Sequence, residues 1–316
     1  MHPPTLQTIQ EAHARIRPHI HRTPVMGSSI LNRKTQSKLF FKCENFQKVA
    51  AFKARGACNA IFSLTDQQAK RGVVTHSSGN HGAALAWAAA KRNITAHIVM
   101  PSNAPKAKKF AVEAYGGKIV FCEPTVSARE AATARLVEEL GLELVHPYND
   151  YRVIAGQGTA ALELLEEVPD LDIVITPLGG GGLLSGTAVA VKGINPKIRV
   201  IGAEPAGADD GFRSFKSGIM VTFATPNTIC DGLRSLLGDK SFALIQEYVD
   251  DIVLASEENV ISAMRQTWEI MKIIIEPSCS PPLGAILDGN LDVAGKRVGI
   301  VLTGGNVDLE NLPWQK

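Results

Sequence analysis

The first residue with chemical promise is a lysine, Lys53, in the stretch KCENFQKVAAFKARGA from Lys42 to Ala57. It directly follows an aromatic residue, Phe52, and stands just before an arginine and a glycine. A lysine amine that is desolvated or placed near another cation has a lowered pKa, and the free amine can attack a carbonyl. The alternative is a lysine at the start of a helix that keeps its charge in water.

Four consecutive glycines form the second candidate site, in PLGGGGLLSG between an apolar strand and an apolar helix. They are Gly179, Gly180, Gly181 and Gly182. Glycines let backbone N–H groups converge on an anion, and the following helix N-terminus adds its positive dipole end. The pattern therefore predicts a phosphate cradle. It matches neither GxGxxG nor GxxxxGK[ST], and a purely structural turn is the alternative.

Two further polar segments follow strands. THSSGNHGAA contains Ser77, Ser78, Asn80 and His81 at the expected carboxyl end of a strand, where open α/β sheets bind ligands. Its serines could hold a carboxylate and its asparagine a ring hydroxyl, whereas a plain helix N-cap would need only one such residue. VLTGGN ends the last strand with Thr303, whose hydroxyl can face a pyridine nitrogen without fixing it as protonated.

Composition limits the partners. The chain has 316 residues with 33 basic and 31 acidic side chains, so no charge excess indicates nucleic acid or an anionic membrane. A small-molecule partner is favoured. The five cysteines show no CxxC or metal spacing, which is typical of reduced thiols and predicts a cytoplasmic protein. The first residues carry charges throughout, so we expect neither a signal peptide nor a membrane anchor there.

The elements that must position these residues alternate between short apolar strands and helices. A helix is expected over 6–16, a strand over 39–42 and an alanine-rich helix over 53–62. From residue 72 onward the alternation continues, with a helix expected over 258–271 and a last strand in RVGIVLTGG. The predicted fold class is α/β, with two open parallel-sheet domains flanked by helices. Residues 72–147 would form a small mobile domain, and 1–71 with 148–316 the large one.

Taken together, the four stretches resemble the fold type II family of PLP-dependent enzymes (PLP, pyridoxal 5'-phosphate). The resemblance is strongest to its serine racemase and serine/threonine dehydratase branch. It runs from SSILN through FFKCENFQK, FKARGA, THSSGNHG, AYGGKIVFCEP, IAGQGT, LGGGGLLSG, AEPAGADD and IEPS to LTGGNVDL.

The resemblance implies roles for the cofactor side of the site. Lys53 would hold PLP as a Schiff base, and Phe52 would pack against the ring. Gly179 to Gly182 would bind the phosphate. Asn80 would meet the ring hydroxyl, and Thr303 would face the pyridine nitrogen.

On the substrate side, the resemblance implies that Ser77, Ser78, Asn80 and His81 line the carboxylate pocket. Arg129 and Ser235 would face the substrate side chain. Lys53 and Ser78 would act on opposite faces of the α-carbon, interconverting L- and D-serine. Loss of the β-hydroxyl instead would make the chain a dehydratase of serine or threonine, giving keto acid and ammonia.

A cation site is implied in AEPAGADD, where Glu204, the Ala208 carbonyl and Asp210 supply hard oxygen ligands for Mg²⁺, or for Ca²⁺ or Mn²⁺. From the residues alone, an acidic surface loop is the alternative. The family also implies a homodimer.

Some residues depart from the family pattern. Ala83 and Val49 stand where animal racemases bind ATP through glutamine and threonine, which makes an ATP effector doubtful. Ala51 replaces a usual serine, and Tyr148 a usual asparagine. Threonine, serine or threo-3-hydroxyaspartate ammonia-lyase activity with little racemisation is therefore the alternative, because Arg129 could pair with a distal carboxylate.

Three other classes fit less well. The β-replacement branch of the family typically has threonine where His81 stands and lacks AEPxxADD. A PLP-binding sensor without turnover would not need Lys53 and Ser78. A nicotinamide dehydrogenase would need the dinucleotide fingerprint and its acidic ribose residue.

Overall fold

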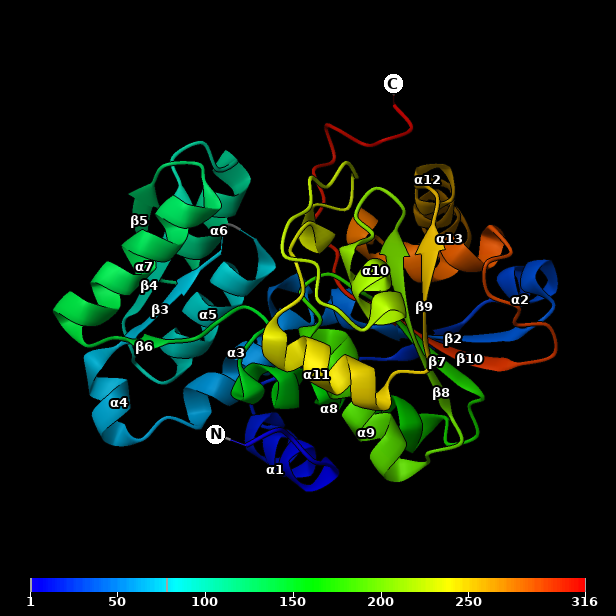
Figure 1. Cartoon of the computed structure of the whole chain (residues 1–316), viewed down its shortest axis with the longest axis horizontal. Helices are drawn as coiled ribbons and strands as arrows, with labels where there is room; N and C mark the ends of the chain where they lie inside the picture. The colour runs from blue at the N-terminus through cyan, green and yellow to red at the C-terminus, as the bar shows by residue number, and fades with distance from the viewer. Residues whose placement is uncertain (1, 78, 316) are drawn as a thin grey trace.

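The computed structural model describes residues 2–77 and 79–315 and shows an α/β fold with two sheets side by side (Figure 1). The predicted fold class is confirmed. The larger sheet has the order β1-β2-β10-β7-β8-β9, and the smaller sheet has the order β5-β4-β3-β6. Among the strands of residues 2–77 and 79–315, the one antiparallel pair is β1 and β2 at the edge of the larger sheet, and sequence patterns did not reveal the edge strand β1.

The strands of the larger sheet are β1 Val25–Gly27, β2 Lys38–Cys43, β7 Ile173–Pro177, β8 Arg199–Pro205, β9 Asp251–Ala255 and β10 Arg297–Leu302. Those of the smaller sheet are β3 Val73–His76, β4 Ala96–Pro101, β5 Lys118–Cys122 and β6 Glu143–Leu144. The central strand β7 is buried at every position, because helices cover both faces of the sheet.

The helices are α1 Leu6–Ile16, α2 Ser29–Thr35, α3 Lys53–Phe62, α4 Asp66–Arg71, α5 Asn80–Lys91, α6 Lys106–Ala114, α7 Val126–Leu140, α8 Tyr151–Glu167, α9 Gly182–Ile194, α10 Asp210–Ser217, α11 Asp239–Tyr248, α12 Glu257–Gln266 and α13 Pro281–Leu287. Short 3₁₀ turns are η1 Glu44–Phe46, η2 Lys48–Ala50, η3 Asp231–Leu233 and η5 Pro277–Cys279. Within the described ranges, no helix is both long and apolar enough to span a membrane.

The helix expected over 258–271 is shorter in the structure. α12 ends at Gln266, and a π-helical turn, η4, follows over Thr267–Met271. The backbone then turns at Lys272, whose φ is 60°. The Trp268 indole N–H donates to the Ile275 carbonyl at 3.0 Å, which holds the chain against this turn. The apolar periodicity continued through the turn because Trp268, Ile270 and Met271 still pack against the core.

The smaller sheet and its helices come from one continuous segment, whereas the larger sheet takes strands from both sides of it. In Figure 1 this segment stands apart on the left. On this arrangement we propose residues 72–147 as the small domain and 1–71 with 148–316 as the large one. One apolar cluster crosses between them, because Ala54 and Cys58 of α3 pack with Ala84 and Leu85 of α5.

Glycines let α8 approach its neighbours closely. A Cβ on Gly156 would lie 2.6 Å from the Gly56 Cα of α3. One on Gly186 of α9 would lie 2.3 Å from the Ile154 carbonyl oxygen and 2.7 Å from the Gly158 nitrogen. No real side chain tolerates such contacts with backbone atoms, so α3, α8 and α9 form one rigid layer under the larger sheet.

We predict that Gly186→Ala lowers the free energy of unfolding by at least about 2 kcal/mol, because the new methyl group forces the helices apart. The matched control is Gly27→Ala, where a Cβ would meet only the Leu39 carbonyl oxygen at 3.7 Å. Urea unfolding of both variants checks this. Equal stability of the two variants would contradict the close packing of α8 and α9.

Candidate active site

Lys53 is the first residue of α3 and is delivered by β2 and the turns η1 and η2. Its amine donates to the Pro147 carbonyl at 2.9 Å and lies 5.1 Å from the centre of the Phe52 ring. Burial lowers the pKa of this amine to about 8, and the nearby carboxyl of Glu276 partly opposes the shift. A fraction of Lys53 is therefore uncharged near neutral pH, as nucleophilic or basic chemistry requires.

Thr303 follows β10 and lies beside the start of α3. The Phe52 N–H donates to the Thr303 carbonyl at 2.9 Å, and Ala51 pairs with Gly304. The Thr303 hydroxyl lies 3.2 Å from the Cys279 sulfur. Thr303 is thus buried next to the lysine that the sequence singled out, although the two are far apart in the chain.

The glycine quartet lies between β7 and α9, as predicted. Gly181 has φ +91°, a conformation that favours glycine, and α9 begins at Gly182 without a side-chain cap. A Cβ on Gly180 would lie 2.4 Å from the Tyr148 ring, and one on Gly182 would lie 3.0 Å from Tyr148. The quartet therefore places backbone N–H groups, with no side chains between them, at a helix N-terminus, in the arrangement that binds a phosphate.

Asn80 begins α5 and is held by two partners. Its side-chain nitrogen donates to the two Glu276 carboxyl oxygens at 2.9 and 3.2 Å, and its oxygen accepts from the Asn306 side-chain nitrogen at 3.0 Å. Burial, followed by Asp231, raises the pKa of Glu276 to about 7. Asn80, Glu276 and Asn306 thus form a polar cluster close enough to Lys53 for Glu276 to influence its amine.

His81 and Ser77 lie on either side of a residue, Ser78, that is outside the described residues. His81 is buried, its Nε2 lies 3.3 Å from the Val145 carbonyl oxygen, and its pKa is well below the usual value because of burial and then the Lys53 charge. It is therefore neutral. The Ser77 hydroxyl accepts from the Gly79 N–H at 3.3 Å.

Arg129 and Ser235 both contribute to the electrostatic environment of Tyr148. Burial and Glu130 raise the pKa of Tyr148, whereas Arg129 and a hydrogen bond with Ser235 oppose the rise. The Arg129 guanidinium also lowers the pKa of His76, after burial. Two of the predicted substrate-side residues, Arg129 and Ser235, thus influence the Tyr148 side chain that packs on Gly180 and Gly182.

The predicted cation ligands lie at the end of β8 and the start of α10. Glu204 is buried and accepts from the Gly211 and Phe212 N–H groups at 3.2 and 2.7 Å. Burial and then Asp210 raise its pKa well above the usual value, and burial raises the pKa of Asp210 to about 6. One Asp210 oxygen is buried with no hydrogen-bond partner in the described part of the chain. Two buried, poorly compensated carboxyl groups suit a divalent cation.

No group of three or more His, Cys, Asp or Glu side chains with metal-ligand geometry occurs among residues 2–77 and 79–315. The predicted site has only two carboxyl groups and one carbonyl, that of the buried residue Ala208. Its remaining ligands would have to be waters, as Mg²⁺ commonly keeps.

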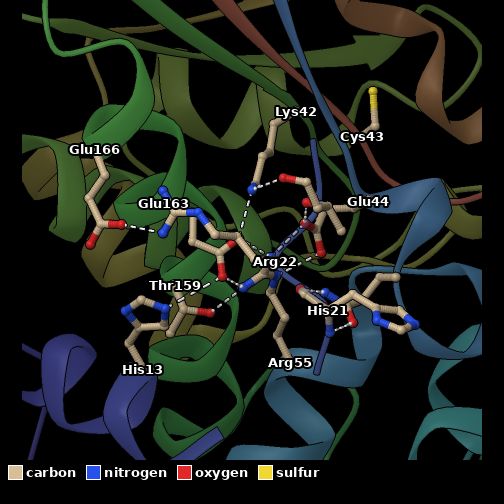
Figure 2. A network of polar contacts seen from close by, with 12 residues as sticks. His13, His21, Arg22, Lys42, Cys43, Glu44, Arg55, Thr159, Glu163 and Glu166 are labelled. Atoms are coloured by element: carbon tan, nitrogen blue, oxygen red, sulfur yellow. Dashed lines mark hydrogen bonds and ion pairs between the residues drawn. The ribbon is translucent and has the colours of Figure 1, made fainter. Parts of the chain in front are cut away.

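Sequence reasoning missed a buried ion-pair network made of Lys42, Glu44, Arg55 and Glu163, here called the Arg55 network (Figure 2). These side chains come from β2, η1, α3 and α8 and are almost fully withdrawn from water. Two cations balance two carboxylates. Spacing could not have revealed the network, because its members are up to 121 residues apart.

The chain belongs to the pyridoxal-phosphate dependent enzyme family, whose model matches residues 16–304. It is 50% identical to beta-hydroxyaspartate dehydratase of Paracoccus denitrificans over 99% of this chain and 100% of that protein. It is 50% identical to serine racemase of Arabidopsis thaliana over 96% of this chain and 94% of that one. The solved structure of maize serine racemase, 48% identical, superposes with a TM-score of 0.96 over 99% and 97% of the two chains. The predicted family is confirmed.

We predict that Glu276→Gln becomes more stable relative to the unsubstituted chain as pH rises. The pKa of Glu276 in the folded state, about 7, exceeds the ordinary glutamate value of 4.5, so the folded state binds this proton more tightly. The proton stabilises the fold fully below pH 4.5, and this contribution is lost as pH rises through about 7. The difference amounts to about 3 kcal/mol at most.

Urea unfolding of the cofactor-free chain at pH 5 and pH 8 measures this difference. Glutamine keeps an oxygen that can accept from Asn80, so the hydrogen bond survives while the titration is removed. A stability difference between variant and parent that is independent of pH would show that Glu276 ionises normally.

Proposed function

We propose that this chain uses PLP to remove the α-proton of serine. It would interconvert L- and D-serine and, in a side reaction, eliminate the β-hydroxyl of serine or threonine to give keto acid and ammonia. The observation that carries the proposal is the half-buried Lys53, whose amine has a pKa of about 8, in a chain about half identical to serine racemases over nearly its whole length. The glycine quartet supports it with a ready anion site.

The residues present fit the cofactor. Lys53 would hold its aldehyde carbon, and Phe52 would pack against its ring. Asn80 has a side-chain N–H directed by Glu276 and would meet the ring hydroxyl. Thr303 would face the pyridine nitrogen, and the N–H groups of Gly179 to Gly182 would bind the phosphate. When bound, PLP supplies an electron sink that acidifies the Cα–H bond of an amino acid.

The chain's own residues would then move protons. The free Lys53 amine would take the α-proton from one face, and the Ser78 hydroxyl would give a proton to the opposite face, which inverts the centre. Ser77, Asn80 and the neutral ring of His81 would hold the substrate carboxylate. In elimination the α-proton and the β-hydroxyl leave together as water, and hydrolysis then releases ammonia.

A second candidate function is dehydration of threo-3-hydroxyaspartate. The relative from Paracoccus denitrificans is named a beta-hydroxyaspartate dehydratase and is as similar to this chain as the plant racemase. Arg129 would pair with a second carboxylate of such a substrate, and Ser235 would bond its side chain. Tyr148 packs against Gly180 and Gly182, so its bulk would help set the size of the accepted side chain.

We also propose a bound divalent cation, Mg²⁺ or Ca²⁺ or Mn²⁺, held by Glu204, the Ala208 carbonyl and Asp210. The buried Asp210 oxygen without a described partner supports it, because a cation would compensate that charge.

ATP activation stays doubtful, since Val49 and Ala83 are apolar and buried. The five free cysteines support a cytoplasmic location, and the likeness to the family supports a homodimer.

We predict that the purified chain, supplied with PLP and incubated separately with L-serine, D-serine, L-threonine and threo-3-hydroxyaspartate, changes the chirality of serine and forms keto acids. Chiral chromatography and a keto-acid assay follow both outcomes together. Lys53→Ala should abolish all turnover and release PLP on gel filtration, because no amine holds the cofactor. Absence of both products from every substrate would refute the proposed function, and keto acid from hydroxyaspartate alone would favour the second candidate.

The two faces of the site can be separated by Ser78→Ala. Because only racemisation needs a group on the second face, this variant should lose racemisation but keep elimination from L-serine. Rates of D-serine and pyruvate formation from L-serine measure the partition. Equal loss of both rates would refute the assignment of Ser78 as the second proton-transfer group.

We predict that a chelator lowers the Tm of the chain by several degrees and that added Mg²⁺ restores it. A ligand at one hundred times its Kd stabilises the folded state by about 2.7 kcal/mol. Differential scanning calorimetry checks this, with Asp210→Asn as the control that should no longer respond to either addition. A Tm that the chelator leaves unchanged would speak against a bound cation.

A further inference from the structure

The Arg55 network uses every N–H group of its guanidinium. The Arg55 Nε and Nη2 donate to the two Glu44 oxygens at 2.7 and 2.8 Å. Nη2 and Nη1 donate to the two Glu163 oxygens at 2.7 and 2.9 Å, and Nη1 also donates to the Thr159 hydroxyl at 3.2 Å. Such a planar, fully bonded guanidinium fixes its own position and orientation.

The charges of the network also balance one another, because each carboxylate is paired with a cation of the network. The Lys42 amine donates to Glu163 at 2.6 Å and to the Thr23 carbonyl at 2.7 Å, and the Thr23 hydroxyl donates to Glu44 at 2.6 Å (Figure 2). Burial alone would raise the pKa of Glu163, but hydrogen bonds from His13 and Arg55 outweigh it and lower that pKa. Removal of one member would leave a buried charge without its partner, which is strongly destabilising.

Arg55 lies in the same helical turn as Lys53. Residues two apart on an α-helix point to opposite sides, and here Lys53 extends to the Pro147 carbonyl while Arg55 extends between Glu44 and Glu163. No side-chain cap holds the N-terminus of α3. Arg55 therefore fixes the turn that carries the Lys53 amine, through ion pairs on the opposite side of the helix.

The segment just before this turn is strained. Val49 and Ala50 have φ values of 54° and 52°, in the left-handed region that a β-branched residue rarely adopts. Such backbone persists only where the surroundings over-determine it. Glu44 at one end and Arg55 at the other belong to the same network, so the network spans the strained segment and fixes both of its ends.

We propose that the Arg55 network is the positioning device for the Lys53 amine, and that Arg55 is a positioning residue for catalysis. The inference rests on the proposed role of Lys53. The Arg55 network holds the first turn of α3, so that the Lys53 amine stays largely away from water and within reach of the site. Misplacement by about 1 Å costs up to about a hundredfold in rate, so a rigid anchor is needed.

Arg55→Lys tests the proposal, because lysine keeps the charge but cannot bond both carboxylates as a fork does. The matched control is Arg297→Lys, which likewise breaks a two-point contact of a guanidinium, here to Asp170, at the end of β10 opposite the site. We expect Arg55→Lys to lower kcat about tenfold or more with KM within about threefold, while Arg297→Lys leaves both unchanged.

The second readout does not depend on turnover. The rate at which the cofactor-free full chain binds PLP, followed by visible absorbance, should rise with pH around the pKa of the Lys53 amine. In Arg55→Lys this midpoint should move up by about one pH unit, because the loosened amine regains water. The charged or titratable groups that face the amine, Glu276, His81 and His146, are the same in both proteins.

If Arg55→Lys fails to fold, Thr159→Val decides, since it removes one bond to Arg55 and leaves no charge unpaired. It should lower kcat two- to threefold and move the midpoint in the same direction. A wild-type kcat and midpoint in whichever of these variants folds, with only Tm reduced, would show that the network is purely structural. Failure of the Lys53 assignment looks different, because Lys53→Ala would then keep PLP through gel filtration.

Discussion

The structure depends on holding one amine, that of the half-buried Lys53, largely away from water at the start of α3. Burial of a cation is unfavourable, so the amine of Lys53 is driven toward its neutral form, and this makes it a base and a nucleophile. The cost has to be met by the rest of the fold. The packing of α3 offsets this cost. α3 packs on α5 of the smaller sheet and on α8 beneath the larger one, and glycines let α3 and α8 pack in direct backbone contact.

The polar groups of the site converge because parallel strands end at the same edge of a sheet. Thr303 follows β10, the glycine quartet follows β7, and Asn80 begins the helix after β3. Each position is a strand end or a helix start, where backbone groups are unpaired and side chains are free to face a ligand. The two sheets bring these ends together, so residues separated by more than two hundred positions form one cluster, as the Asn80 and Asn306 contact shows.

Sequence patterns correctly predicted those features that are determined by residues close together in the chain. The helix over 53–62 and the glycine quartet were found because alanine content and consecutive glycines are local signals. Glu276 was not assigned a role although IEPS is part of the family resemblance, because its hydrogen-bond partner Asn80 is distant in the chain. The left-handed backbone at Val49 could not be predicted either, since valine disfavours it and only tertiary contacts impose it.

The buried carboxyl groups separate into two kinds, and the difference distinguishes scaffold from site. Glu163 has cations and hydrogen-bond donors enough to lower its pKa, so it is charged at every physiological pH and acts as fixed structure. Glu276, Glu204 and Asp210 have raised pKa values because burial is not matched by cations. A fold gains nothing in stability from such under-compensated acids. Their presence at strand ends and helix starts is consistent with selection for ligand binding rather than for folding, because a bound cation or a cofactor with its own donors would complete the compensation.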